Sequence, residues 1–230
     1  MHLTQRMPRE TGREYALRTI KDNIIRLELV PGGMVSENEL SAEMGLSRTP
    51  VREALIELSK VKIVDIYPQR GSSVALIDYA LVEESRFMRN VLECAVVELV
   101  CTMASPEDIH RLAENVRLQN FYLESHNPVP LMELDDQFHR TLFEIGQKPQ
   151  VYTMMENIAI HFDRVRSMAL STVKDLKIVQ DHQMIVDAIS HHDGAAARAQ
   201  MEIHLSRYKI DESAIRERYQ IGRASCRERV

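Results

Sequence analysis

Two residue patterns in this sequence could carry chemistry, and the first combines a carboxylate with imidazoles. Asp135 and His139 are four residues apart in a helical pattern, which places both side chains on one face, one turn apart. Two later apolar segments each contain a histidine, His182 and His204. Each of these residues alone is more typical of a hydrogen-bonded or solvated side chain than of a ligand. Together, one Asp and three His on three helices form a donor set that suits Zn, Ni, Mn or Fe.

The second pattern is a pair of arginines at the start of a short predicted helix. Thr49 is a suitable N-cap, Pro50 suits the first helical position, and the apolar spacing over residues 51–58 predicts a buried face. Arg48 and Arg52 lie off that face, near the helix N-terminus. Guanidinium groups and free backbone N–H groups at such a terminus suit phosphates and base edges. The alternative is a capped surface helix with incidental arginines.

The flanking residues favour the DNA-binding interpretation. Residues 36–45 begin with a Ser/Glu capping box and end at a glycine, which predicts a second helix just upstream. Downstream, the β-prone segments 63–67 and 73–77 are joined by a turn that contains Arg70 and Gly71. A helix-turn-helix followed by two strands with a basic tip predicts a winged helix.

Residues 15–77 resemble the winged-helix domain of GntR-type bacterial transcription regulators. The resemblance rests on segments 29–32, 36–40, 46–55 and 70–74. One departure is Lys62, where the family usually has a glycine before the first wing strand. We expect the DNA contacts to come from the two helices and the wing tip, namely Arg48, Thr49, Arg52, Asn38, Arg70 and Gly71.

The chain from residue 78 onward predicts only helices, at least five antiparallel ones with short connections, which makes a bundle. Asp-x-x-Phe-His at 135–139, His182 before Ile-x-x-Ala-Ile, and His204 before Leu resemble the FCD effector domain, which defines the FadR-like branch of the GntR family. The resemblance covers residues 79–208. It implies that Asp135, His139, His182 and His204 bind a divalent metal inside the bundle, and that a small carboxylate effector completes the coordination.

Arg89 and Arg166 are the expected effector-binding residues. Arg89 matches an arginine near the family's pocket, and a guanidinium facing the bundle interior would bind a carboxylate bidentately. The alternative is a surface salt bridge with Glu93 or Asp163.

A second departure occurs at residues 147–149, Gln-Lys-Pro, where the family often has Asn before Pro. Four protein ligands on an octahedral ion leave two positions for water or an effector carboxylate.

Length and charge support a two-domain protein. Its 230 residues exceed the usual size of one domain. Residues 1–77 carry 11 basic and 10 acidic side chains, whereas residues 78–220 carry 15 basic and 23 acidic ones. The first domain is therefore nearly neutral, and its DNA binding must rely on individually placed arginines rather than on a general positive potential. We assign a DNA-binding domain to 1–77, with a frayed start over residues 1–13, and a helical effector and dimerisation domain to 78–220. The basic tail 221–230 resembles vector-derived sequence.

The remaining features narrow the class of protein. No apolar segment approaches 18 residues and the N-terminus has no signal-peptide core, so we expect no membrane association and a cytoplasmic protein. The interpretation is a mainly α transcription regulator, a repressor and not an enzyme, that binds an inverted repeat of operator DNA as a homodimer. Two alternatives are a metal-dependent hydrolase that uses the three-His, one-Asp site, and a direct sensor of the metal.

Overall fold

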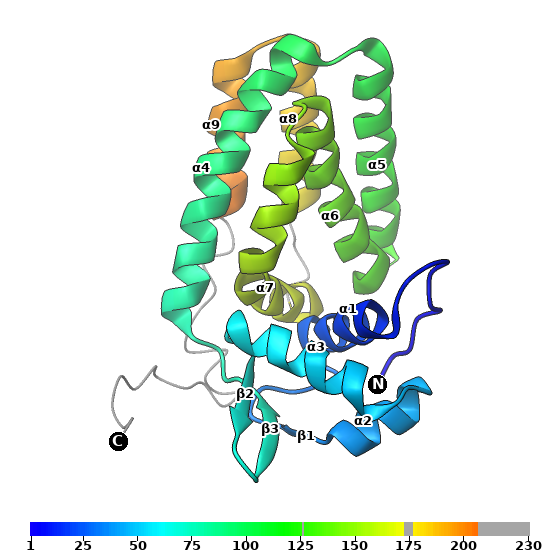
Figure 1. Ribbon diagram of the computed structural model, residues 1–230. Coiled ribbons are helices and arrows are strands. Elements are labelled where there is room, and N and C mark those ends of the chain that lie inside the picture. The colour runs from blue at the N-terminus through cyan, green and yellow to red at the C-terminus, as the bar shows by residue number, and fades with distance from the viewer. Residues whose placement is uncertain (126, 173–176, 207–230) are drawn as a thin grey trace. The chain divides into compact units, whose positions relative to one another are not determined.

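The computed structural model describes residues 1–125, 127–172 and 177–206, and the chain divides into two compact units (Figure 1). One unit contains Met1–Val82 and the other begins at Glu83. The fold is mainly α, as predicted, with an N-terminal winged helix-turn-helix and a C-terminal helical bundle. None of the described helices is both long and apolar enough to cross a membrane. The functional boundary after residue 77 stays a prediction, and the tail 221–230 lies outside the described residues.

The first unit combines three helices with a small antiparallel sheet. Its helices are α1 (Gly12–Ile25), α2 (Glu37–Met44) and α3 (Arg48–Lys60), and its strands are β1 (Met34–Val35), β2 (Val64–Tyr67) and β3 (Gly71–Val74). The strand order is β1-β3-β2, so β3 lies between the other two. Helix α3 packs on α1, α2 and β2, and buries its apolar face there. The sequence predicts only the two wing strands, because a two-residue strand such as β1 is too short to show alternation.

The recognition helix α3 begins earlier than its sequence pattern indicates. Its first residue is Arg48 and the N-cap position belongs to Ser47, so the prediction of Thr49 as N-cap and Pro50 as first helical residue is wrong. Pro50 is tolerated as the third residue because the amides of the first turn have no partner inside the helix in any case. The preceding turn is as predicted: Gly45 ends α2 in the left-handed conformation, with φ 64°.

Both segments in which the sequence departs from the GntR and FCD patterns contain a residue with left-handed backbone. Lys62 has φ 59° in the turn between α3 and β2, and Gln147 has φ 56° in the turn after α6 (Pro128–Ile145). A glycine or an asparagine enters this region more readily than other residues do. At Lys62 the backbone therefore keeps the conformation that a glycine would favour, at the cost of backbone strain.

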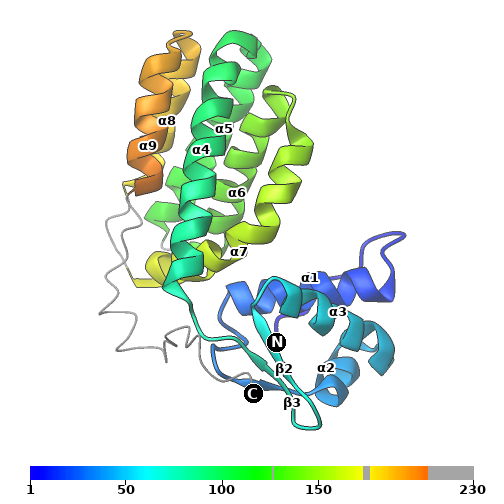
Figure 2. The same cartoon turned by 60° about the vertical axis from the view of Figure 1, so that its left-hand side comes forward.

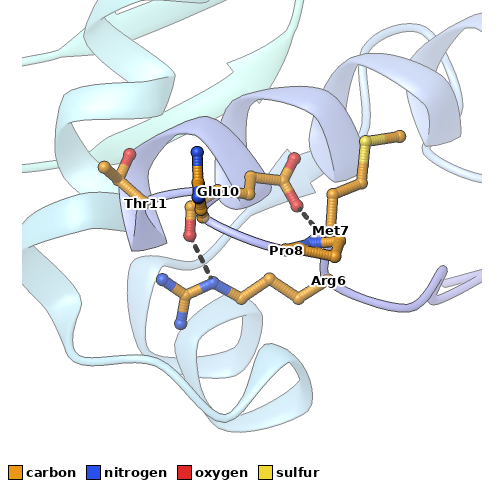
Figure 3. Close-up of a pocket in the computed structure, with 6 residues that line it drawn as sticks. Arg6, Met7, Pro8, Glu10 and Thr11 are labelled. Atoms are coloured by element: carbon orange, nitrogen blue, oxygen red, sulfur yellow. Dashed lines mark hydrogen bonds between the residues drawn. The ribbon is translucent and has the colours of Figure 1, made fainter.

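Residues before α1 are held against that helix, which contradicts the expectation of a frayed segment. The backbone N–H of His2 donates to Asn23 Oδ1 at 2.7 Å, and Arg18 Nε donates to Glu10 Oε1 at 2.8 Å. Thr11 caps α1. The residues around this cap line a small hollow, with Arg6 Nε donating to the carbonyl of Glu10 (Figure 3). Apolar spacing alone does not reveal these contacts, because polar side chains make them.

The second unit is an all-helical bundle (Figure 2). Its helices are α4 (Tyr79–Met103), α5 (Pro106–Glu124), α6 (Pro128–Ile145), α7 (Pro149–Thr172), α8 (Ile178–Ser190) and α9 (Gly194–Ser206). Helix α5 packs against α6 and α8, α6 packs against α7, and α8 lies beside α9. A single apolar core joins these helices through residues such as Val97, Leu112, Phe138, Ile185 and Met201. The core therefore brings α6, α8 and α9 close together, and these three helices carry the predicted metal ligands.

Candidate metal centre and candidate DNA interface

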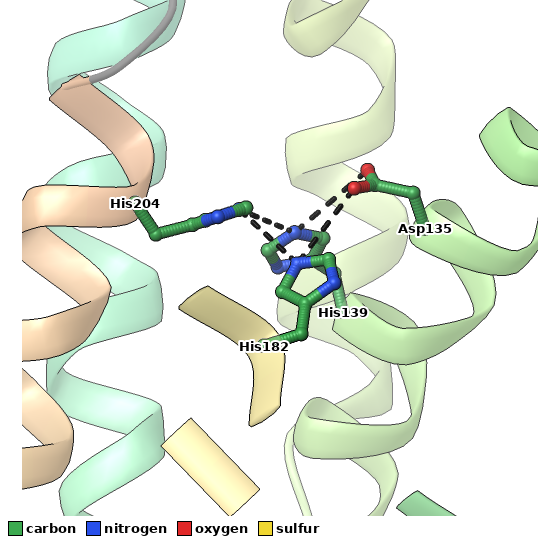
Figure 4. Close-up of side chains that lie close together, drawn as sticks. All are labelled: Asp135, His139, His182 and His204. Atoms are coloured by element: carbon green, nitrogen blue, oxygen red, sulfur yellow. Dashed lines mark hydrogen bonds and ion pairs between the residues drawn. The ribbon is translucent and has the colours of Figure 1, made fainter. Parts of the chain in front are cut away.

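Four side chains from three helices converge in the interior of the bundle (Figure 4). Asp135 and His139 lie one turn apart on α6, His182 comes from α8 and His204 from α9. All four are buried, and one potential ligand atom from each lies within 4.8 Å of the others. His204 Nε2 is 3.2 Å from His139 Nε2 and 3.3 Å from His182 Nε2. The residues that the sequence singles out as a ligand set are thus neighbours in space.

Each histidine in this cluster turns its other ring nitrogen, Nδ1, toward an oxygen. His182 Nδ1 lies 2.8 Å from Gln119 Oε1, and His139 Nδ1 contacts the carboxylate of Glu93. His204 Nδ1 lies 3.9 Å from Asp181 Oδ2. Because an acceptor holds the N–H of an imidazole, the contacts of His182 and His139 favour a lone pair on Nε2, which faces the other ligands, whereas the 3.9 Å separation at His204 is too long for a hydrogen bond.

The tautomer of His182 follows from its neighbours. Gln119 donates through Nε2 to Asn115 Oδ1 at 2.6 Å, which leaves its Oε1 as an acceptor. His182 Nδ1 must then carry the hydrogen, and Nε2 is the basic nitrogen. Burial, followed by the neighbouring histidines, lowers the pKa of His182 and of His204 well below the usual value. Both rings are therefore neutral at pH 7, and the neutral ring is the form that binds a metal.

The spacing of the histidine nitrogens in the cluster fits a single divalent ion. Metal–nitrogen bonds of about 2.1 Å separate neighbouring ligand nitrogens by roughly 3.0 Å at right angles and roughly 3.4 Å in a tetrahedron. The two Nε2 separations, 3.2 and 3.3 Å, lie in this interval. Asp135 Oδ1 is buried and accepts no hydrogen bond from the described residues; His182 Nε2 is 3.7 Å away. The cluster can thus hold a metal, and nothing in it selects the element.

Arg166 is buried in α7 and is bound to the carboxylate of the cluster. Its Nη1 donates to Asp135 Oδ2 at 2.5 Å, its Nη2 contacts Asp136, and Asp163 Oδ1 lies 3.4 Å from Nη2. The side chain of Arg166 is 1% exposed. Arg166 therefore does pair with Asp163, which is the alternative that the sequence leaves open. Its guanidinium is buried, however, and also binds Asp135, a candidate metal ligand.

Arg89 on α4 is linked to the cluster through the carboxylate of Glu93. Its Nε donates to Glu93 Oε1 at 2.6 Å, and the second oxygen of Glu93 contacts His139. Burial opposes ionisation of Glu93, but the neighbouring Arg89 guanidinium and the contact with His139 lower its pKa to about 2. Arg89 thus forms the salt bridge with Glu93 that the sequence offers as an alternative, but the pair is buried and not at the surface.

Three neighbours of the cluster, Glu93, Gln119 and Asp181, do not stand out in the sequence as site residues. Glu93 is four residues from Arg89, a spacing that suggests the ion pair but not the contact with His139. Gln119 carries no local pattern, and it reaches His182 only because α5 packs on α8. Glu93 and Gln119 contact candidate ligands directly, and all three neighbours are recognisable only in the packed bundle.

The predicted DNA-contacting residues lie on the exposed parts of the first unit. Arg48, Thr49 and Arg52 occupy the first turns of α3, and Asn38 lies in the first turn of α2. Arg70 and Gly71 lie at the β2–β3 turn, where Gly71 has φ 97°. All six are exposed.

Comparison with known proteins identifies the class. A winged helix-turn-helix joined to a helical bundle with a buried polar centre is the architecture of a bacterial DNA-binding transcription regulator. The model of the bacterial regulatory proteins of the gntR family matches residues 14–74, and the FCD domain model matches residues 84–207. The chain belongs to the GntR family, and its second half is an FCD domain.

Individual relatives agree with this assignment. The HTH-type transcriptional repressor RspR of Escherichia coli K12 is 33% identical over 211 residues, which cover 91% of this chain and 92% of that protein. An HTH-type transcriptional regulator in an unstable DNA locus of Streptomyces ambofaciens is 33% identical over 199 residues, 85% of this chain and 82% of that protein. These relatives are regulators, which does not favour the hydrolase alternative.

Two solved structures share the fold. Escherichia coli McbR/YncC superimposes with a TM-score of 0.76 at 18% identity. The superposition covers 85% of this chain and 94% of the McbR/YncC chain. A GntR regulator from Rhodococcus sp. RHA1 superimposes with a TM-score of 0.72 at 22% identity. The superposition covers 90% of this chain and 99% of the Rhodococcus chain.

Proposed function

We propose that this regulator is a repressor whose operator binding is controlled by a small carboxylate metabolite at a divalent-metal site in the second unit. The observation that carries the proposal is the convergence of Asp135, His139, His182 and His204 within 4.8 Å in the buried interior. The Escherichia coli relative RspR is a transcriptional repressor, which supports repression. A bound divalent ion would supply Lewis-acid positions at which a carboxylate oxygen can coordinate.

On the DNA side, we assign operator contacts to the exposed side chains of the first unit. Arg48 and Arg52 are placed at the start of α3, where they suit base edges and phosphates in the major groove. Arg70 at the wing tip suits a phosphate or the minor groove. One winged helix buries too little DNA surface for tight specific binding, so we propose that a homodimer binds an inverted repeat.

On the effector side, the buried arginines act next to the ligands. Arg166 orients Asp135 through its hydrogen bond, and Arg89 orients His139 through Glu93. An anionic effector at the centre would add its charge beside these two guanidinium groups, which favours its binding. The contacts that it changes there would alter operator affinity by a coupling of about 1–3 kcal/mol.

The test uses the full chain after aerobic purification with a divalent salt. Elemental analysis and native mass spectrometry report the bound ion and any co-purified acid, and fluorescence anisotropy reports binding to a duplex enriched from random DNA. The proposal expects about one ion per chain and an operator affinity that an organic acid changes about 5- to 150-fold.

Other results would contradict the proposal in distinct ways. An affinity that responds to the metal alone, and to no acid, would indicate a metal sensor. Metal-dependent turnover of a carboxylic acid derivative would indicate the hydrolase. A chain that binds no metal at neutral pH would remove the basis for the effector site.

A further inference from the structure

An acidic residue of α2 holds the two arginines at the start of α3. Arg52 Nε lies 3.0 Å from Glu37 Oε1 and 3.1 Å from Oε2, and Arg52 Nη2 lies 2.8 Å from Oε2. Arg48 Nη2 lies 3.5 Å from the same Oε2. Glu37 is thus the common partner of both predicted DNA-contacting arginines, although it carries the charge that DNA repels.

Glu37 is held in place by the start of its own helix. Ser36 caps α2 by accepting a hydrogen bond from the backbone N–H of Glu39, so Glu37 occupies the first helical position. Its side chain is 26% exposed, against 55% for Arg52. The hydrogen bond from Arg52 lowers the pKa of the Glu37 carboxyl, so the group is ionised at neutral pH. A charged acceptor on a capped helix therefore faces a more exposed arginine.

Glu37 contacts one edge of the Arg52 guanidinium, and a second edge remains for another acceptor. A guanidinium can bind two acceptors in parallel either along its Nε/Nη edge or at its Nη1/Nη2 end. Glu37 occupies the edge formed by Nε and Nη2. No hydrogen bond to Nη1 occurs within the described part of the chain. The Nη1 side of Arg52 is thus the part that can face a base edge while the pair with Glu37 persists.

We infer that Glu37 is a positioning residue for sequence-specific recognition, because it orients Arg52 toward a base edge before the protein meets DNA. The inference rests on the proposed operator binding. An unrestrained arginine loses rotamer freedom when it binds, whereas an arginine already fixed by a carboxylate loses less. Glu37 therefore raises the affinity for the correct sequence more than its own charge lowers the affinity for DNA in general.

The sign of the effect distinguishes this role from simple electrostatics. Removal of a negative charge near DNA strengthens binding to every sequence if charge alone matters. Removal of a positioning residue weakens binding to the preferred sequence and leaves non-specific binding equal or stronger. Glu39 provides the matched control, because it lies in the same first turn of α2 and is exposed, and it forms no ion pair with the described residues.

The experiment compares Glu37→Gln and Glu39→Gln in the full chain by fluorescence anisotropy. The probes are a duplex that wild-type protein enriches from random DNA and a scrambled duplex of equal length. We expect Glu37→Gln to bind the enriched duplex about tenfold more weakly and the scrambled duplex no more weakly, and Glu39→Gln to bind both at least as tightly as wild type. If Glu37→Gln matches Glu39→Gln on both duplexes, the inference is wrong. If Glu37→Gln does not fold, Glu37→Asp, which keeps the charge and shortens the reach, takes its place.

A second arm excludes a merely structural role for Glu37. In an Arg52→Ala background, Glu37→Gln should change affinity for the enriched duplex less than about twofold, because its partner is gone. A persistent tenfold loss in that background would mean that Glu37 supports the fold of α2, and would overturn the inference. If wild-type protein enriches no duplex, the proposed operator binding and this inference both fall, whereas equal behaviour of the two Gln variants removes the inference alone.

Discussion

Arg166 on α7 donates a hydrogen bond of 2.5 Å to Asp135 on α6, and both side chains are buried. The pair joins the predicted effector arginine to the predicted carboxylate ligand of the metal. Asp135 consequently has a cationic partner that the protein itself supplies.

Loss of Arg166 should destabilise the metal-free protein more than the metal-loaded protein. In Arg166→Gln the Asp135 carboxylate stays buried without a cation, a situation that costs about 3–5 kcal/mol. A bound divalent ion compensates that charge, so the loss should shrink when metal is added. Urea unfolding with chelator and with metal measures the difference. Arg140→Gln, which removes an exposed pair with Glu156, is the control and should cost less than about 1 kcal/mol in both conditions.

Metal uptake should depend on the two histidines that come from α8 and α9. The double variant His182→Ala, His204→Ala should lose its ion while the first unit stays folded, because that unit contains neither residue. Elemental analysis gives the metal content, and circular dichroism with non-specific DNA binding checks the winged helix. His110→Ala changes an exposed histidine of α5 and should retain the ion. A double variant that keeps its full metal content would show that the ion binds elsewhere.

Gln119 should tune metal affinity without touching the ion. Gln119→Leu removes the acceptor that orients His182 Nδ1, so metal affinity should fall about 10- to 100-fold. Competition with a chromophoric chelator measures this change. Gln183→Leu serves as the comparison, since Gln183 is exposed and donates to Asp187 on the same helix. Equal affinities for the two variants would argue against a role for the Gln119–His182 contact.

A glycine at position 62 should stabilise the winged helix. Lys62 has φ 59°, a conformation that costs a side-chain-bearing residue about 1–2 kcal/mol and glycine almost nothing. Because glycine also gains entropy in the unfolded chain, the net gain should be about 0.5–1 kcal/mol. Chemical denaturation measures it. Lys21→Gly inside α1 should show the opposite sign, a loss of about 1 kcal/mol; a loss in both variants would refute the strain at Lys62.

The ion pair of Glu10 with Arg18 should make stability depend on acid pH. The hydrogen bond from Arg18 lowers the pKa of Glu10 from 4.5 to about 2. A lowered folded-state pKa means that the stabilisation is complete above pH 4.5 and is lost as the pH falls toward 2. Glu10→Gln should therefore be less stable than wild type at pH 7, by less than about 1 kcal/mol because the pair is partly solvated. Thermal unfolding across this pH range should show the two proteins converging at low pH. A difference that persists unchanged at pH 2 would assign the effect to packing, and Glu53→Gln, at an exposed position of α3, controls for net charge.

Local spacing in the sequence was sufficient for the features that one helix or one turn determines. Asp135 and His139 share a face because four residues make about one turn of any α-helix. Gly45 ends α2 because glycine enters the left-handed region without a steric cost. Local spacing places the start of α3 two residues too late, because Ser47 and Thr49 are both suitable caps and local preference does not choose between them.

Only the tertiary structure decides which distant residues meet. His182 and His204 reach Asp135 because the apolar faces of α8 and α9 are buried in a common core with α5 and α6. The partners Arg166–Asp135, Glu93–His139 and Gln119–His182 join helices that periodicity treats as independent. Helical periodicity specifies the direction of a side chain relative to its own axis, whereas packing of several helices sets the distance between side chains on different axes.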